Sequence, residues 1–127
     1  MAQVYLTGPS LVLGADDTVV LSDASDGAVG SVMVHLDTES AGTIAVTVKA
    51  RARSVPRADT SVAWQPIPYL VLTDGGVVAS GATYATATLT GNDIIIIPAS
   101  GLSIALDVDY TSGTHRAYVE RLIGAAA

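Results

Sequence analysis

The chain has 127 residues, which is the size of one ordinary domain. It contains no cysteine, so disulfide bonds, thiolate metal sites and a cysteine nucleophile are excluded. Twelve acidic residues against six basic ones give a formal net charge of -6, which argues against attraction to nucleic acid or to an anionic membrane.

The composition favours strands and a buried surface. Hydrophobic residues make up 50% of the chain and charged residues 14%, where soluble domains usually have about 25% charged residues. The chain has no phenylalanine, so valine, isoleucine, leucine and alanine must fill the core, and the β-branched members of this group favour strands. With a mean hydropathy of +0.48, the protein is expected to cover part of its surface by assembling.

Apolar and polar residues alternate along three stretches, at Ser31–Asp37, Thr43–Arg53 and Leu102–Thr111. This period of two predicts strands with one buried and one solvated face, as in antiparallel sheets. Turn residues separate further strands, which we predict at Val4–Thr7, Thr18–Ser22, Val62–Trp64, Tyr69–Thr73, Thr83–Thr90, Asp93–Ile97 and His115–Ile123.

Strands of this length and spacing indicate an all-β fold, specifically an antiparallel β-sandwich that is jelly-roll-like. We predict a single domain over residues 1–127, with an extended segment at 1–15 and a frayed tail at 124–127. The start of the chain lacks the pattern of a secretory signal. The longest aliphatic run, Ile94–Ile97, is far shorter than the roughly 20 residues that span a bilayer, so no membrane partner is expected.

Basic residues cluster in and after the strand predicted at Thr43–Arg53. Two interpretations stay open for them. They form a solvated face, balanced either by Asp107 and Asp109 or by Asp37 and Glu39, or they form an interface that docks an acidic neighbour through the arginine fork. The residues of this candidate interface are Lys49, Arg51, Arg53 and Arg57.

Trp64, the only tryptophan, is the last candidate interface residue. It lies in a stretch with three prolines, Pro56, Pro66 and Pro68, which cannot be a central strand throughout. We expect Trp64 to fill the core, with an interface anchor as the alternative. A sugar-binding platform would need more aromatic residues nearby than Tyr69.

The remaining polar residues do not form a recognisable catalytic or metal-binding set. His35 and His115 lack the spacing of metal ligands and are expected to face solvent. The acidic positions in residues 16–27 fit ordinary turns better than a calcium loop. Asp107 and Asp109 share one face of a strand and are expected to form cross-strand ion pairs rather than a glycosidase pair. No Gly-x-Ser-x-Gly elbow is present. We therefore predict no enzyme activity, metal or cofactor.

Several segments resemble small virion structural proteins of tailed bacteriophages. The resemblance covers roughly residues 28–123, and it implies a capsid decoration (cement) protein or, less specifically, a head or tail structural role. It also implies a jelly-roll-like subunit that often forms trimers. The segments that carry it are Gly30–Asp37, Gly42–Arg51, Trp64–Tyr69, Ala99–Asp107 and Tyr110–Gly113.

On these grounds we expect a virion protein that binds the major capsid protein or another virion protein and stabilises the shell. We expect a homo-oligomer, with a trimer favoured, located on the capsid surface and without a nucleic-acid partner. The alternative is a carbohydrate- or receptor-binding β-sandwich module of a tail fibre, or another tail structural protein.

Overall fold

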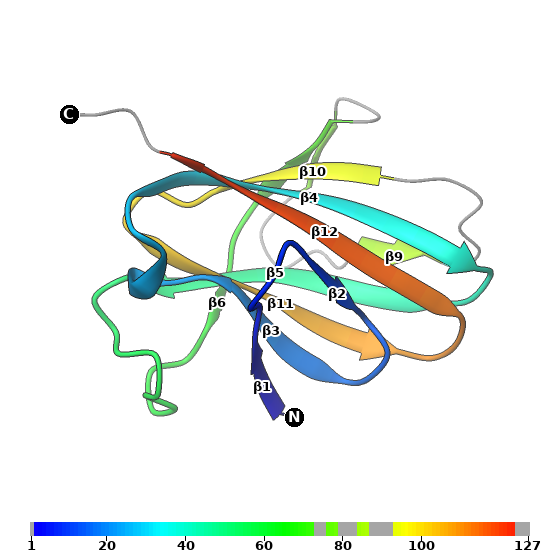
Figure 1. The fold of residues 1–127 in the computed structure, drawn as a ribbon, viewed down its shortest axis with the longest axis horizontal. Helices are drawn as coiled ribbons and strands as arrows, with labels where there is room; N and C mark the ends of the chain where they lie inside the picture. The colour runs from blue at the N-terminus through cyan, green and yellow to red at the C-terminus, as the bar shows by residue number, and fades with distance from the viewer. Residues whose placement is uncertain (1, 73–75, 79–83, 87–92, 124–127) are drawn as a thin grey trace.

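The computed structural model describes residues 2–72, 76–78, 84–86 and 93–123, and its strands form two facing sheets (Figure 1). In the view of Figure 1, β10, β4 and β12 lie above β5, β11 and β3. The predicted all-β antiparallel sandwich is confirmed. Successive long strands pass from one sheet to the other, as they do in jelly rolls.

Sheet A is antiparallel apart from its first pair, β1 with β3, which is parallel. Both β6 and β9 pair with the same edge of β5. In spatial order the sheet contains β1 (Ala2–Tyr5), β3 (Asp17–Ser22), β11 (Leu102–Tyr110), β5 (Ile44–Ala52) and β6 (Gln65–Pro66), while β9 (Tyr84–Thr86) pairs with the first residues of β5.

Sheet B is antiparallel in every described pair. A single 3-10 turn, η1 (Ala24–Asp26), connects β3 of sheet A to β4 of sheet B. In spatial order sheet B contains β2 (Ser10–Val12), β12 (Thr114–Ile123), β4 (Val29–Ser40), β10 (Asp93–Pro98), β7 (Tyr69–Val71) and β8 (Gly76–Val78).

The core lies between the sheets and follows the alternation read from the sequence. Val34 of β4 pairs with Ile95 of β10 on one side and with Val119 of β12 on the other, and all three side chains are buried. Direct cross-strand partners share a face, so one register fixes the inward set of several strands at once. Tyr69 is the one aromatic residue in the buried cluster of the described chain.

Several predicted strands need correction. The strand predicted at Val62–Trp64 is wrong, because β6 begins only at Gln65. Just before it, the Asp59 carboxylate accepts hydrogen bonds from the backbone N–H groups of Ser61 and Val62, so side-chain bonds replace a strand ladder there. The short strand β2 was not predicted. Of the strand predicted at Thr83–Thr90, the structure shows β9, and its remaining residues, like the predicted tail at 124–127, lie outside the described residues.

Two glycines hold the loops together at one end of the sandwich. Gly42 lies between β4 and β5, and Gly113 lies between β11 and β12 with a φ of +88°. A Cβ atom added to Gly42 would stand 2.2 Å from the carbonyl oxygen of Ser112 and 2.3 Å from the Cα of Gly113. The backbone carbonyl of Thr43 also accepts hydrogen bonds from the N–H groups of residues 111 and 112. The two loops therefore pack backbone to backbone, which only glycine permits.

We predict that Gly42→Ala lowers the free energy of unfolding by at least about 2 kcal/mol, because the added methyl group must displace backbone rather than a flexible side chain. Urea denaturation followed by circular dichroism measures the effect. Gly8→Ala is the matched control, since a Cβ there meets nothing within 4 Å. Equal stability of the two variants would contradict the packing described here.

Candidate interaction surfaces

The four clustered basic residues do not form one solvated stripe. Lys49 forms an ion pair with Asp107 across β5 and β11, with its Nζ 2.5 Å from Oδ2, which confirms the expected cross-strand pairing. Asp107 also accepts a hydrogen bond of 2.7 Å from Thr18. Arg53 lies beyond the end of β5 and is half-buried. The outer face of sheet A therefore satisfies much of its charge internally.

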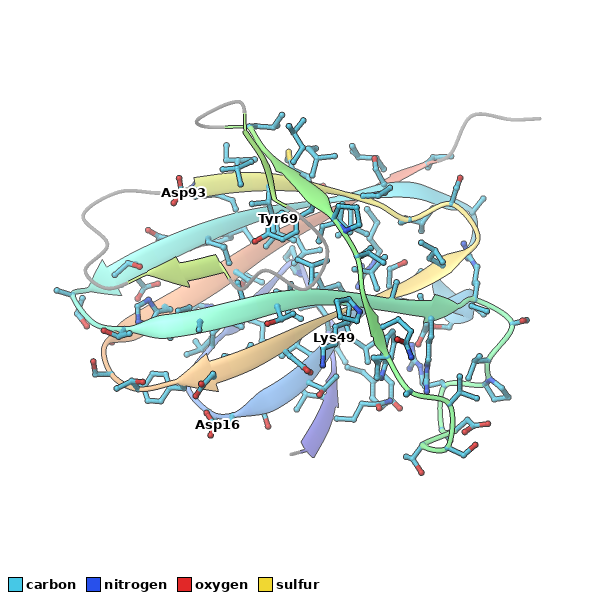
Figure 2. All side chains as sticks on the ribbon, turned by 180° about the vertical axis from the view of Figure 1, so that it is seen from behind. Asp16, Lys49, Tyr69 and Asp93 are labelled. Atoms are coloured by element: carbon cyan, nitrogen blue, oxygen red, sulfur yellow. The ribbon has the colours of Figure 1, made fainter. Side chains whose placement is uncertain are left out.

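Arg51 is buried, with 6% of its surface exposed, so the prediction that it faces solvent is wrong. Its Nη1 donates to the carbonyl oxygens of Asp59 and Val62, at 2.7 and 3.2 Å, and its Nη2 lies within 3.5 Å of two further loop carbonyls. Residues 53–64 form the loop after β5, which is drawn in green in Figure 2. Arg51 does point away from the core, as the alternation requires. It is nevertheless buried, because the backbone carbonyl oxygens of this loop surround its guanidinium.

Trp64 packs on Arg51 rather than in the core, so the expected core position is wrong. The guanidinium carbon of Arg51 lies 4.3 Å from the centroid of the Trp64 ring, which is cation–π geometry. Gln65 pairs with Ala50, so Trp64 comes opposite Arg51 on the outward face. The side chain is half-buried and absent from the core cluster.

Arg57 ties the same loop to the acidic turn before β4. Its Nε and Nη2 donate to the two carboxylate oxygens of Asp23, at 2.7 and 3.1 Å. Asp23 also accepts from the Ser25 backbone and hydroxyl, and so caps η1. Tyr5 donates to the Arg57 carbonyl at 2.8 Å and lies beneath its guanidinium. Together with the Arg51 contacts, these bonds fix the loop at both ends.

The surroundings of Asp23 keep it ionised. Burial alone would favour the neutral acid, but hydrogen bonds from Arg57 and Ser25 outweigh burial and lower the pKa of Asp23 to about 2. The acidic turn is therefore an ion-paired cap. Among the described residues, no group of three His, Asp or Glu side chains is placed to hold a metal ion.

The two histidines differ from each other. His115 is 1% exposed, so the prediction that it faces solvent is wrong. Its Nε2 donates to the carbonyl oxygen of Ser112, and its Nδ1 lies 3.0 Å from the hydroxyl oxygen of Thr38. It belongs to the packed end that contains Gly42. His35 is half-buried on the outer side of sheet B, where its ring lies 6.0 Å from that of Tyr118.

The outer side of sheet B carries a continuous apolar face. Its residues are sequence neighbours of core residues on the same strands, or direct cross-strand partners of such neighbours, so they point away from the core. Among the described outward-pointing residues in the rows from Ser31 to His35, Glu120 is the one charged side chain. We call this set the apolar face; it consists of Met33, Leu70, Leu72, Ile94, Ile96, Pro98, Tyr118 and Leu122.

Sequence reasoning missed the apolar face, although a signal for it was present. Ile94–Ile97 is apolar on both sides of its strand, a pattern usual for strands that are covered on both faces. In the structure Ile95 and Ile97 are buried in the core, while Ile94 and Ile96 belong to the apolar face. Leu72, Tyr118 and Leu122 are 47%, 43% and 42% exposed.

An apolar groove of about 440 Å³ opens within this face, where β4, β10 and β7 meet. Ile123, the last residue of β12, is 87% exposed and pairs, after a register shift, with Val29 of the core. Leu122 pairs with Ser31, which lines the groove. The full lining consists of Gly30, Ser31, Pro68, Tyr69, Leu70, Ile96 and Pro98.

Comparisons with models of known protein families, with curated proteins and with solved structures found no match. Within the described residues, no helix is long and apolar enough to cross a membrane.

We predict that Arg51→Met destabilises the protein by about 2–4 kcal/mol, because four loop carbonyls lose a charged donor at a buried site. Limited trypsin digestion should cut faster at Arg57, since the loop that contains it loses its hydrogen bonds to the Arg51 guanidinium. Chemical denaturation and the digestion rate measure both effects. Arg53→Met, which removes a charge just outside the strand, should change stability by less than about 0.5 kcal/mol. A similar loss in both variants would refute the stabilising role of the hydrogen bonds from Arg51 to the loop.

The Asp23–Arg57 pair predicts an acid-sensitive contribution to stability. Because folding lowers the pKa of Asp23 from 3.8 to about 2, the contribution is complete above about pH 4 and is lost as the pH falls towards 2. Its size is about 2 kcal/mol. Asp23→Asn should be less stable at pH 6 and lose less stability between pH 4 and 2, as measured by urea denaturation across pH. Asp109→Asn, at an exposed position, controls for the loss of one carboxylate.

Proposed function

We propose that the protein is a non-enzymatic structural subunit of a tailed-bacteriophage virion, specifically a capsid decoration protein that binds and stabilises the shell. The observation that carries the assembly role is the apolar face of sheet B. Leu72, Tyr118 and Leu122 are each more than two fifths exposed there. Glu120 is the one charged side chain among the described outward-pointing residues in the rows from Ser31 to His35.

A contiguous apolar surface of this kind usually marks a protein-interaction site. Each Å² of apolar surface removed from water contributes roughly 25 cal/mol. A subunit that occurs in many copies can combine such modest contacts into strong overall binding, because neighbouring contacts act together. The apolar face therefore supports a protein that acts by covering another surface.

The outer face of sheet A supports the same role in a different way. Lys49 is paired with Asp107, Arg51 is bound by loop carbonyls, and Arg57 is paired with Asp23. These three basic side chains therefore have ion-pair or hydrogen-bond partners within the subunit. An interface through these basic residues stays a prediction, but the apolar face is the better candidate for binding.

The bacteriophage assignment rests on the sequence resemblance over residues 28–123, and with it the proposed partner, the major capsid protein, and the location in the virion. The carbohydrate-binding alternative needs an exposed aromatic platform. One ring face of Trp64 is covered by Arg51, and Tyr69 is buried. These two positions favour the assembly proposal over sugar binding.

We predict that mass spectrometry of purified virions finds this protein, and that the purified protein binds expanded capsids that lack it. Leu72→Glu should weaken capsid binding by roughly tenfold or more, because it places a charge in the apolar face. Val62→Glu changes an equally exposed apolar residue in the loop after β5 and should bind like the wild type. Absence of the protein from virions, together with no capsid binding, would refute the proposed function.

A further inference from the structure

We infer that the apolar face docks a basic segment of a partner protein, which places an aliphatic side chain in the groove and a lysine or arginine opposite Glu120. The inference deepens the proposed function, and it rests on it in taking the apolar face as the surface that meets the partner. Three features of sheet B carry it: how the groove forms, which polar groups surround it, and where the single charge of the face lies.

Two facing prolines open the groove between β7 and β10. Leu72 donates a backbone hydrogen bond to the carbonyl oxygen of Ile94, and in an antiparallel pair such bonding positions recur every two residues. Continuing along both strands therefore brings Pro68 opposite Pro98 at a bonding position. Neither proline has an N–H group, so the ladder ends there and leaves a gap. Both prolines line the groove.

The backbone groups at this gap can accept hydrogen bonds but cannot donate them. The carbonyl oxygens of Pro68 and Pro98 point towards each other's strand, and neither proline supplies an N–H for the other. Ser31 adds a hydroxyl, while Leu70 and Ile96 give the groove apolar walls. A docked segment is therefore favoured when it brings an aliphatic side chain together with hydrogen-bond donors.

Glu120 lies in the same cross-strand row as one wall of the groove. It pairs with Met33, and Met33 pairs with Ile96; their strands, β12, β4 and β10, run side by side in Figure 1. Two strand spacings, roughly 10 Å, therefore separate Glu120 from Ile96. Glu120 is exposed, and within the described ranges its carboxylate has no ion-pair partner. A lone carboxylate on an apolar surface is complementary to a single cation of the partner.

The charges around Glu120 favour a basic partner over a second copy of this chain. Arg116, on the same side of β12, is already paired with Glu39. Arg121, next in sequence to Glu120, points the other way and donates to a backbone carbonyl of β3 at 2.8 Å. The whole chain carries a net charge of -6. A lysine or arginine is therefore attracted both by Glu120 and by the overall charge, whereas another copy is repelled.

The separation between the groove and Glu120 sets the spacing of the two contacts in the partner. A distance of roughly 10 Å corresponds to about seven residues along a helix or about three along an extended chain. The flexible thioether of Met33 lies between the two contact points and can adapt to the docked surface. An aliphatic residue and a basic residue at this spacing satisfy the groove and the carboxylate together.

Three probes with the same apolar tail test this chemistry on the full chain: n-octylamine, n-octanol and n-octanoate. Titration at about pH 7, followed by amide NMR, should give the octylammonium ion a dissociation constant at least about fivefold lower than that of octanoate at low salt. Shifts should be largest around Leu70, Ile96 and Met33. Sodium chloride at about 0.5 M should remove the preference, because it screens an exposed charge.

Glu120→Gln should abolish the preference for octylammonium and leave the affinity for octanol unchanged. Asp109→Asn is the matched control, because it removes one exposed carboxylate from sheet A and should keep the preference. Circular dichroism checks that both variants are folded. Failure of all three probes to bind, shifts that lie elsewhere, or equal affinity for all three head groups would overturn the inference; equal affinity would indicate a lipid-type apolar site.

Capsid binding separates this inference from the proposed function. Glu120→Lys should weaken binding to expanded capsids by roughly tenfold or more, because it opposes two cations in an apolar contact. Capsid binding that Glu120→Lys leaves unchanged would overturn the docking chemistry and leave the decoration role standing. A protein that selects octylammonium through Glu120 but is absent from virions and binds no capsid would refute the decoration role alone.

Discussion

The aliphatic layer between the two sheets is the constraint on which the rest of the molecule depends. With no phenylalanine in the chain, the layer consists of small branched side chains such as Val34, Ile95 and Ile97, which are fully buried. A shift of one residue in any strand would move its entire inward set to the outside. The same register therefore decides both what fills the core and what each sheet presents outward.

What the two sheets present outward differs, and the difference follows from how polar groups are satisfied. On sheet A the alternation places Arg51 outside the core, where a bare guanidinium would be fully solvated. The chain instead folds residues 53–64 back so that loop carbonyls accept from it, while Trp64 covers its face. Arg57 then ties this loop to Asp23. One register position on β5 thus explains an irregular loop that contains Pro56 and has no strand of its own before Gln65.

Much of the fold could be predicted from the sequence, because alternation reports directly on a core between two sheets. The strands at 29–40, 44–52 and 102–110 follow from it, as does the Lys49–Asp107 pair. The same reasoning failed for Arg51 and His115, because it equates a polar residue with a solvated one. Whether a polar side chain is buried depends on partners outside its own strand, such as the Asp59 carbonyl for Arg51 in the following loop and the Thr38 hydroxyl for His115 on a distant part of the chain. No local pattern encodes those partners.

At the apolar face the prediction failed in the opposite way, because a side expected to be polar is apolar. This failure is more informative about function than the burial of Arg51 and His115. Strict alternation leads one to assign Met33, Ile94 and Ile96 to an ordinary solvated side, yet between Ser31 and His35 the described residues of that side carry a single charge, at Glu120. On sheet A, outward polar groups find partners within the subunit. On sheet B, Leu72, Tyr118 and Leu122 point outward and stay open to water. A fold that resolves many of its polar contacts internally and leaves an apolar surface open presents the kind of surface at which proteins usually bind one another.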